Sequence, residues 1–156
     1  ADILNDRFKH ASSTFPDIHT LNTRNVDPIQ YIKDITKGKG VDIAFEAVGH
    51  EVDVEGRLNP VRTAINAIKG GGTVCALGLS DHPAAILMKE LIWKEAVIVA
   101  SRVTHGEFAT AIDALDKGLL DPSKMITSVL DLKDAQKGFE ILTKDPASQL
   151  KILLKI

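Results

Sequence analysis

The first side chain that could do chemistry in this 156-residue sequence is an aspartate near its start. Asp2 sits where an early strand would end, and a carboxylate there accepts two hydrogen bonds from a vicinal diol such as the ribose of a dinucleotide. Arg7, on the following helix turn, could flank the same adenosine end. Without context, Asp2 is more often a helix-start or surface aspartate, and Arg7 a solvated arginine.

Two glycines mark a second place where a ligand could be held. The apolar run at residues 41–49 ends at Gly49, and the run at residues 73–79 contains Gly78. Both runs have the character of buried parallel strands, and ligands of such sheets sit just beyond the carboxyl ends of the strands. A glycine there lets the backbone approach a ligand closely. The predicted ligand-facing segments are Ala47, Val48 and Gly49, and Leu77, Gly78 and Leu79.

Other reactive side chains lack the spacing that their chemistry needs. The five histidines form no paired metal-binding spacing, and the single cysteine excludes a multi-cysteine metal site and an intrachain disulfide. Cys75 lies inside an apolar strand without a basic neighbour, so a small core residue is the better interpretation. Ser80, Asp81 and His82 are adjacent in sequence, which does not make a catalytic triad. We therefore predict no catalytic residue and no metal ligand in this chain.

The elements that must position these residues alternate between strand and helix. Between the two apolar runs, residues 61–69 carry apolar side chains at helical spacing and precede three consecutive glycines. Apolar strands joined by a crossover helix argue for a parallel sheet covered on both faces, so we predict a doubly wound α/β domain. The predicted helices are residues 5–11, 29–37, 61–69, 84–93, 107–117 and 135–143, and the predicted strands are residues 17–22, 41–49, 73–79, 96–101, 126–130 and 150–156.

Composition excludes several classes of function. With 44% hydrophobic and 26% charged residues, the chain has the composition of an ordinary globular domain. A formal net charge of -2, without a basic run interleaved with aromatics, argues against nucleic acid or an acidic membrane as a partner. The longest apolar runs are too short to span a bilayer, and the first residues do not form a signal peptide. We therefore expect a cytoplasmic protein.

Four stretches, in order along the chain, resemble the medium-chain, zinc-type alcohol and polyol dehydrogenase family. Residues 2–7 resemble the end of that family's second nucleotide-binding strand, residues 40–49 its fourth strand and residues 71–79 its fifth. The fourth stretch is the tail at residues 134–142 and 150–155. Together they cover nearly the whole chain.

The resemblance implies an NAD-dependent dehydrogenase that passes a hydride between a small alcohol or polyol and nicotinamide. It implies that Asp2 holds the adenosine ribose, with Arg7 beside it, and favours NAD over NADP because a 2′-phosphate would face a carboxylate. Residues 96–101 resemble the edge strand through which family members pair their sheets, so we expect a homo-oligomer. Expected along the cofactor are Ala47, Val48, Leu77, Gly78 and Leu79, with Arg102 also near the cofactor and Lys151 at the pyrophosphate.

The resemblance also implies what the sequence does not contain. The family's catalytic domain with its zinc ligands is missing, and so are the first nucleotide-binding strand and its glycine-rich loop, so we expect an incomplete Rossmann-type sheet. We expect residues 1–101 to be part of the NAD-binding domain and residues 102–156 to return toward the missing domain, where zinc would bind. Two alternatives stay open: a catalytically silent nucleotide-binding or oligomerisation module, and a zinc-independent reductase of the quinone-reductase type. Whether this chain is itself an enzyme also stays open.

Overall fold

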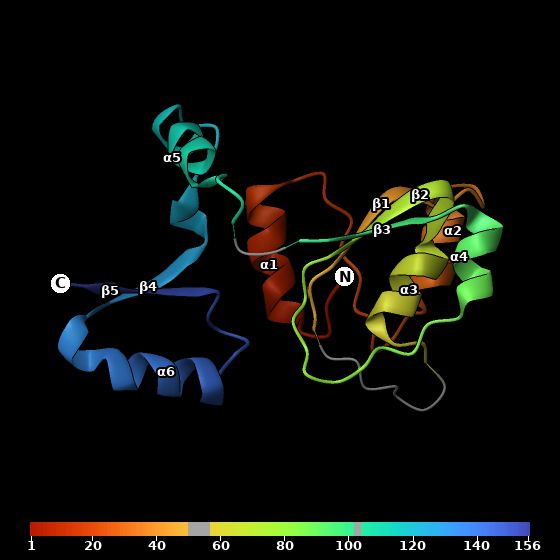
Figure 1. Ribbon diagram of the computed structural model, residues 1–156. Helices are drawn as coiled ribbons and strands as arrows, with labels where there is room; N and C mark the ends of the chain where they lie inside the picture. The colour runs from red at the N-terminus through yellow and green to blue at the C-terminus, as the bar shows by residue number, and fades with distance from the viewer. Residues whose placement is uncertain (50–56, 102–103) are drawn as a thin grey trace. The chain divides into compact units, whose positions relative to one another are not determined.

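The chain forms two compact units, and each is described by itself. A computed structural model describes residues 1–49, 57–101 and 104–156 (Figure 1). The central unit runs from Val26 to His105. The split unit combines residues 1–25 with residues 106–156.

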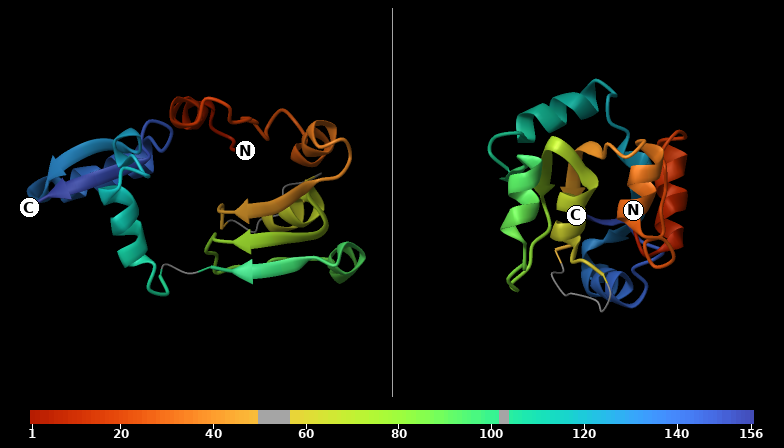
Figure 2. Two further views of the ribbon diagram at one scale, coloured as in Figure 1. Left: turned by 90° about the horizontal axis from the view of Figure 1, so that it is seen from above. Right: turned by 90° about the vertical axis from the view of Figure 1, so that its right-hand side faces the viewer.

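Three parallel strands form the sheet of the central unit, in the order β1-β2-β3. The left view of Figure 2 shows them side by side and running in the same direction. Among the described residues, β1 and β3 each pair with β2 alone. Parallel strands separated by helices confirm the predicted α/β class. The elements are α2 (Pro28–Ile35), β1 (Val41–Glu46), α3 (Pro60–Ala67), β2 (Ile68–Ala76), α4 (Met88–Lys94) and β3 (Val97–Ala100).

The core of the central unit lies between α3 and one face of this sheet. Ile65, Ile68 and Val74 are almost completely buried, and each such side chain stabilises the fold by about 1.5–3 kcal/mol. Strand residues alternate between the two faces, and Ala44, the partner of Val74 in β1, packs against the same core. On the opposite face, Phe45 is 67% exposed. The buried core of this unit is therefore one-sided.

Strand β2 begins earlier than the glycine pattern predicts. The glycines at 70–72 are expected to stop a helix that includes residue 69, but β2 already runs through them. Val41 pairs with Ile68 and Ile43 pairs with Thr73. The register shifts between these two pairs, and the glycines lie in the extra residues of β2. The prediction is wrong because pairing with β1 overrides the local preference of glycine for ending a helix.

The split unit contains a two-stranded parallel sheet. Strands β4 and β5 pair, and α6 connects them. Gly138 of α6 is buried, with the side chains of Leu130 and Ile152 close to the position of a Cβ atom. The strand predicted at residues 17–22 is wrong, because only one isolated parallel bridge joins Asp2 to Asn22. The elements are α1 (Asn5–Thr14), α5 (Phe108–Asp116), β4 (Ile126–Asp131), α6 (Ala135–Lys144) and β5 (Lys151–Lys155), with short 3-10 turns at Pro122–Lys124 and Leu132–Asp134.

An ion pair joins α3 to α4, which begins four residues later than predicted. Arg62 Nη2 lies 2.7 Å from Glu90 Oε1, and Arg62 Nε donates to Oε2 at 3.2 Å. These hydrogen bonds outweigh the effect of burial and hold the pKa of the Glu90 carboxyl below its ordinary value. Lys94 Nζ donates to the backbone oxygens of Asn66 and Ile68. Helix α4 is therefore attached to the end of α3 by charged side chains.

Replacing Glu90 with glutamine is expected to lower the free energy of unfolding by about 1–3 kcal/mol near neutral pH, because Arg62 loses a charged partner in a largely buried place. A carboxyl whose pKa is lowered by folding stabilises the folded state above its unfolded value, 4.5, and that contribution is lost as the pH falls through the folded value. The difference between wild type and Glu90→Gln should therefore shrink below pH 4.5.

Urea unfolding at a series of pH values measures this difference. Asp42→Asn is the matched control, because it removes the partner of Lys69 in an ion pair of the same unit whose aspartate side chain is 82% exposed. We expect the control to have the smaller effect. A Glu90→Gln effect that stays constant across the acid range would contradict the prediction.

Candidate functional site

The carboxyl ends of β1 and β2 meet through the backbone of Glu46. Its carbonyl oxygen accepts hydrogen bonds from the N–H groups of Leu77, at 2.7 Å, and Gly78, at 3.0 Å. The last paired residues of β1 and β2 are Glu46 and Ala76. These two hydrogen bonds therefore extend the contact between the two chain segments beyond the end of the sheet. We call residues 46–49 and 77–79 the strand-end junction.

The side chain of Glu46 closes the first turn of this junction. It is 3% exposed, and its Oε1 accepts from the N–H groups of Val48 at 2.6 Å and Gly49 at 3.1 Å. Its Oε2 is buried and has no hydrogen-bond partner among the described residues. Glu46 was not among the predicted site residues. The available signal was an acidic residue at the end of an apolar strand, three positions before a glycine.

Glycines let the two turns of the junction touch. Gly49 has a φ of 69°, and a Cβ atom on it would collide with the backbone of Leu79. A Cβ atom on Gly78 would collide with the backbone of Gly49 and would lie 2.7 Å from Glu46 Oε2. The turns therefore pack backbone against backbone, and the carboxylate lies directly behind Gly78.

Exposed apolar side chains border the junction. Val48 is 59% exposed and Leu79 is 86% exposed, while Leu77 and Ala47 are exposed beside them. Because Glu46 already accepts from the N–H groups of Leu77 and Gly78, the carbonyl oxygens are the backbone groups that these two residues can offer to a ligand. The junction therefore combines apolar side chains with backbone acceptors, a combination common in small-molecule sites.

Asp2 and Arg7 lie together in the split unit. Asp2 Oδ1 accepts from the N–H groups of Ile3 at 2.7 Å and Leu4 at 2.9 Å, and Asp2 Oδ2 pairs with Arg7 Nη1 at 3.3 Å. The backbone of Asp2 bridges to that of Asn22. The carboxylate is therefore oriented on both sides before any ligand arrives, and its side chain is 26% exposed.

The remaining predicted site residues lie elsewhere. Lys151 is the first residue of β5 and is exposed, with its N–H donating to Thr127 Oγ1 at 3.3 Å. Arg102 lies outside the described residues. The structure thus brings five predicted residues together in the central unit and pairs two in the split unit. The five are Ala47, Val48, Leu77, Gly78 and Leu79, and the two are Asp2 and Arg7.

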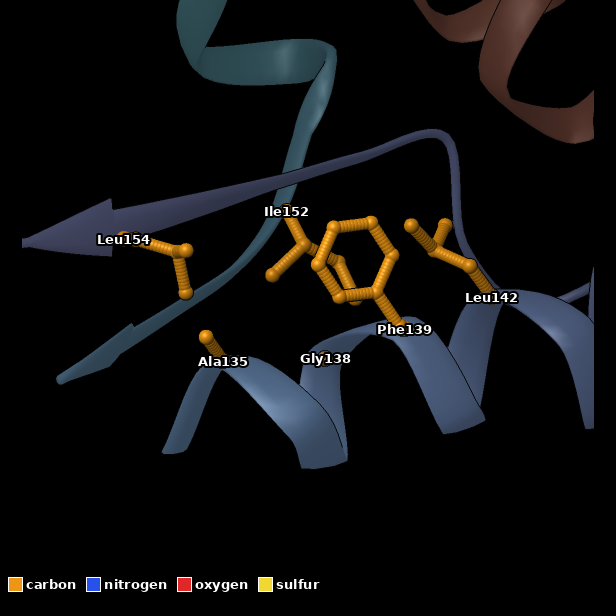
Figure 3. Close-up of a pocket in the computed structure, with 6 residues that line it drawn as sticks. All are labelled: Ala135, Gly138, Phe139, Leu142, Ile152 and Leu154. Atoms are coloured by element: carbon orange, nitrogen blue, oxygen red, sulfur yellow. The ribbon is translucent and has the colours of Figure 1, made fainter. Parts of the chain in front are cut away.

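An open apolar hollow lies in the split unit, between α6 and β5 (Figure 3). Its side chains face one another across the space between the helix and the strand, and none carries a polar group. No acid–base or hydrogen-bonding chemistry can therefore be assigned to it. The lining residues are Ala135, Gly138, Phe139, Leu142, Ile152 and Leu154.

The described part of the chain offers few groups for metal or membrane binding. No three side chains of the metal-binding types His, Cys, Asp and Glu come together there. Cys75 is a free, half-buried thiol in β2. Among the helices within the described ranges, none has the length and apolar character that crossing a bilayer requires.

Comparison with known sequences gives one family. The model of the zinc-binding dehydrogenase family matches residues 1–117. An uncharacterized zinc-type alcohol dehydrogenase-like protein of Haemophilus influenzae is 27% identical over 97% of this chain and 42% of its own length. The (R,R)-butanediol dehydrogenase of Neisseria gonorrhoeae is 26% identical over 87% of this chain and 37% of its own length. The chain thus spans about two fifths of the length of the curated relatives it matches.

Comparison with solved structures gives the same fold. The 2R,3R-butanediol dehydrogenase of Bacillus subtilis superposes with a TM-score of 0.84 and 25% identity, over all of this chain and 43% of its own. An alcohol dehydrogenase of Escherichia coli CFT073, solved in complex with NADH, has a TM-score of 0.84 and 22% identity over 99% of this chain and 43% of its own. The fold is therefore that of a Rossmann-type dehydrogenase domain.

Proposed function

Because the chain belongs to the zinc-binding dehydrogenase family, we propose that it supplies the cofactor-binding part of an NAD-dependent alcohol or polyol dehydrogenase. The observation that carries the proposal is the strand-end junction, where two glycine turns pack at the carboxyl ends of neighbouring parallel strands. Ligands of open parallel sheets bind at this edge. When bound, NAD accepts a hydride from an alcohol carbon, and the small alcohol or polyol is the second ligand of the site.

The junction is assigned the nicotinamide end of the cofactor. Leu77, Gly78 and Leu79 would face the ring, with carbonyl oxygens accepting from its carboxamide and the Leu79 side chain excluding water from one face. Ala47 and Val48 would line the cleft beside it. The fit is good because glycine leaves the backbone bare where the ring must approach.

The split unit is assigned the adenosine end. Asp2 would accept hydrogen bonds from the ribose hydroxyls, while Arg7 keeps the carboxylate oriented and lies beside the adenosine. Lys151, an exposed cation, would reach the pyrophosphate. No zinc ligand is assigned to the described residues, because no suitable cluster is present among them. A catalytic zinc in this proposal belongs to the family's catalytic domain.

The proposal also includes the domain organisation, the pairing of two copies and the cellular compartment. Residues 1–101 are assigned to cofactor binding, and residues 102–156 to the segment that returns toward the catalytic domain. Two copies are proposed to pair through residues 96–101. Support comes from β3, whose residues are exposed and which, among the described strands, pairs with β2 alone. The cytoplasm is the proposed compartment.

Asp2→Asn is expected to reduce the preference of the full-length protein for NAD over NADP by about tenfold, because it removes the charge that a 2′-phosphate would face and keeps Oδ1 as an acceptor. Calorimetric titration with NAD⁺ and NADP⁺ measures the two dissociation constants. Asp6→Asn is the matched control, since it removes an exposed charge from the following helix.

Four outcomes are informative. Binding of NAD⁺ with activity toward alcohols supports the proposed function, and binding without activity supports a silent nucleotide-binding module. Tighter binding of NADP⁺ than of NAD⁺ by the wild type would instead favour the quinone-reductase type. If the wild type binds neither cofactor, the proposed function is wrong.

A further inference from the structure

The Glu46 carboxylate is the most unusual buried group in the central unit. It receives two N–H donors at Oε1, and its Oε2 has no partner among the described residues. A buried carboxylate that has no paired cation among the described residues is costly, which points to a role beyond packing. The two convergent amides stabilise negative charge on Oε1.

The Glu46 carboxylate lies close to Gly78, where a glycine leaves room for it. Oε2 would lie 2.7 Å from a Cβ atom on Gly78, and the Glu46 backbone oxygen accepts from the N–H groups of Leu77 and Gly78. One residue therefore holds both turns of the strand-end junction and places its carboxylate behind the backbone assigned to the nicotinamide.

We infer that the buried Glu46 carboxylate sets the relative affinity of the site for the two redox forms of a nicotinamide cofactor, favouring the oxidised form. This inference rests on the proposed function. The oxidised ring carries a positive charge and the reduced ring carries none, while the rest of the cofactor is the same. A fixed negative charge behind the ring therefore attracts one form and not the other. Glu46 is a positioning residue that holds the two turns, and its negative charge supplies an electric field at the ring.

The expected size follows from Coulomb's law. At an effective dielectric constant of about 20, two opposite unit charges that are about 10 Å apart attract each other enough to change an affinity on the order of tenfold. Glu46→Gln removes that charge and retains the oxygen that accepts from Val48 and Gly49. The ratio of the dissociation constant for NAD⁺ to that for NADH should rise on the order of tenfold in this variant.

The experiment titrates NAD⁺ and NADH separately into the full-length wild-type protein and into Glu46→Gln. Asp42→Asn is the matched control, because it removes an exposed charge from the opposite end of the same strand and should leave the ratio unchanged. Glu46→Asp retains the charge on a shorter side chain, so it should weaken both forms together. Glu46→Met, similar in length and neutral, is the second neutral variant if the glutamine protein does not fold.

Each outcome decides the inference. A ratio that rises in the neutral variants and stays constant in Glu46→Asp supports it. Equal weakening of NAD⁺ and NADH in the neutral variants would show that Glu46 only holds the turns, which overturns the inference and leaves the proposed function intact. A wild-type protein that binds neither form overturns the proposed function and this inference with it.

Discussion

Replacing Gly78 with alanine is expected to weaken the binding of NAD⁺ and NADH by the full-length protein about 100-fold or more. The added Cβ atom would collide with the backbone of Gly49 and lie 2.7 Å from Glu46 Oε2. The Gly49 neighbour is backbone, and the Glu46 carboxylate is held at its other oxygen, Oε1, by two amides. The turns must therefore separate, and inserting a methyl group into a well-packed place costs about 1–3 kcal/mol and sometimes more, which is on the order of 10²-fold in an affinity.

Gly70→Ala is the matched control for this prediction. Gly70 lies in β2, the strand that ends just before Gly78, but no atom lies within 4 Å of the position of its Cβ, and its φ is not positive. Titration calorimetry measures binding, and circular dichroism reports whether each variant folds. If Gly78→Ala folds and binds the cofactor as the wild type does, the strand-end junction is not the cofactor site.

Replacing Asn59 with leucine is expected to lower the free energy of unfolding by about 2–4 kcal/mol, because two hydrogen bonds are lost at a buried place. Asn59 is 1% exposed. Its Oδ1 accepts from the N–H of Arg62 at 2.9 Å and caps α3, and its Nδ2 donates to the carbonyl of Ala85 at 2.8 Å. Leucine would fill the space but leave that carbonyl and the helix terminus without these partners.

Asp27→Leu provides the comparison. Asp27 caps α2 by accepting from the N–H of Ile29, and a proline follows it, as at Asn59, but its side chain is exposed and makes no second bond of this kind. We expect the control to cost about 1 kcal/mol, the usual value of an N-cap. Urea unfolding monitored by circular dichroism measures both. Equal effects would mean that the bond to Ala85 contributes little.

Much of the fold could be read from local patterns. The apolar run at residues 41–49 and the helical spacing at residues 61–69 each predict an element that the structure contains. Such patterns work because the periods of helix and strand are set by neighbouring residues. The glycines at 49 and 78 predict a ligand edge at the carboxyl ends of their strands, and in the structure these two glycine turns pack together.

Pairing between distant segments decided the rest. Whether residues 68–72 belong to a helix end or to β2 depended on β1, about 30 residues earlier in the chain. Residues 17–22 have strand-forming side chains but gain only one bridge, and an extended segment needs a partner to become a strand. Local preference was too weak to settle either case.

The burial of Glu46 was decided by tertiary structure. In the sequence it is one acidic residue in an apolar run. Two amide donors, from residues 48 and 49, reach its carboxylate within the turn, and two more, from residues 77 and 78, reach its backbone oxygen only when β1 and β2 pair in register. The spacing of apolar residues in the sequence predicts which side chains are buried. Whether the carboxylate is buried against Gly78 depends on how β1 and β2, which are far apart in the chain, are brought together.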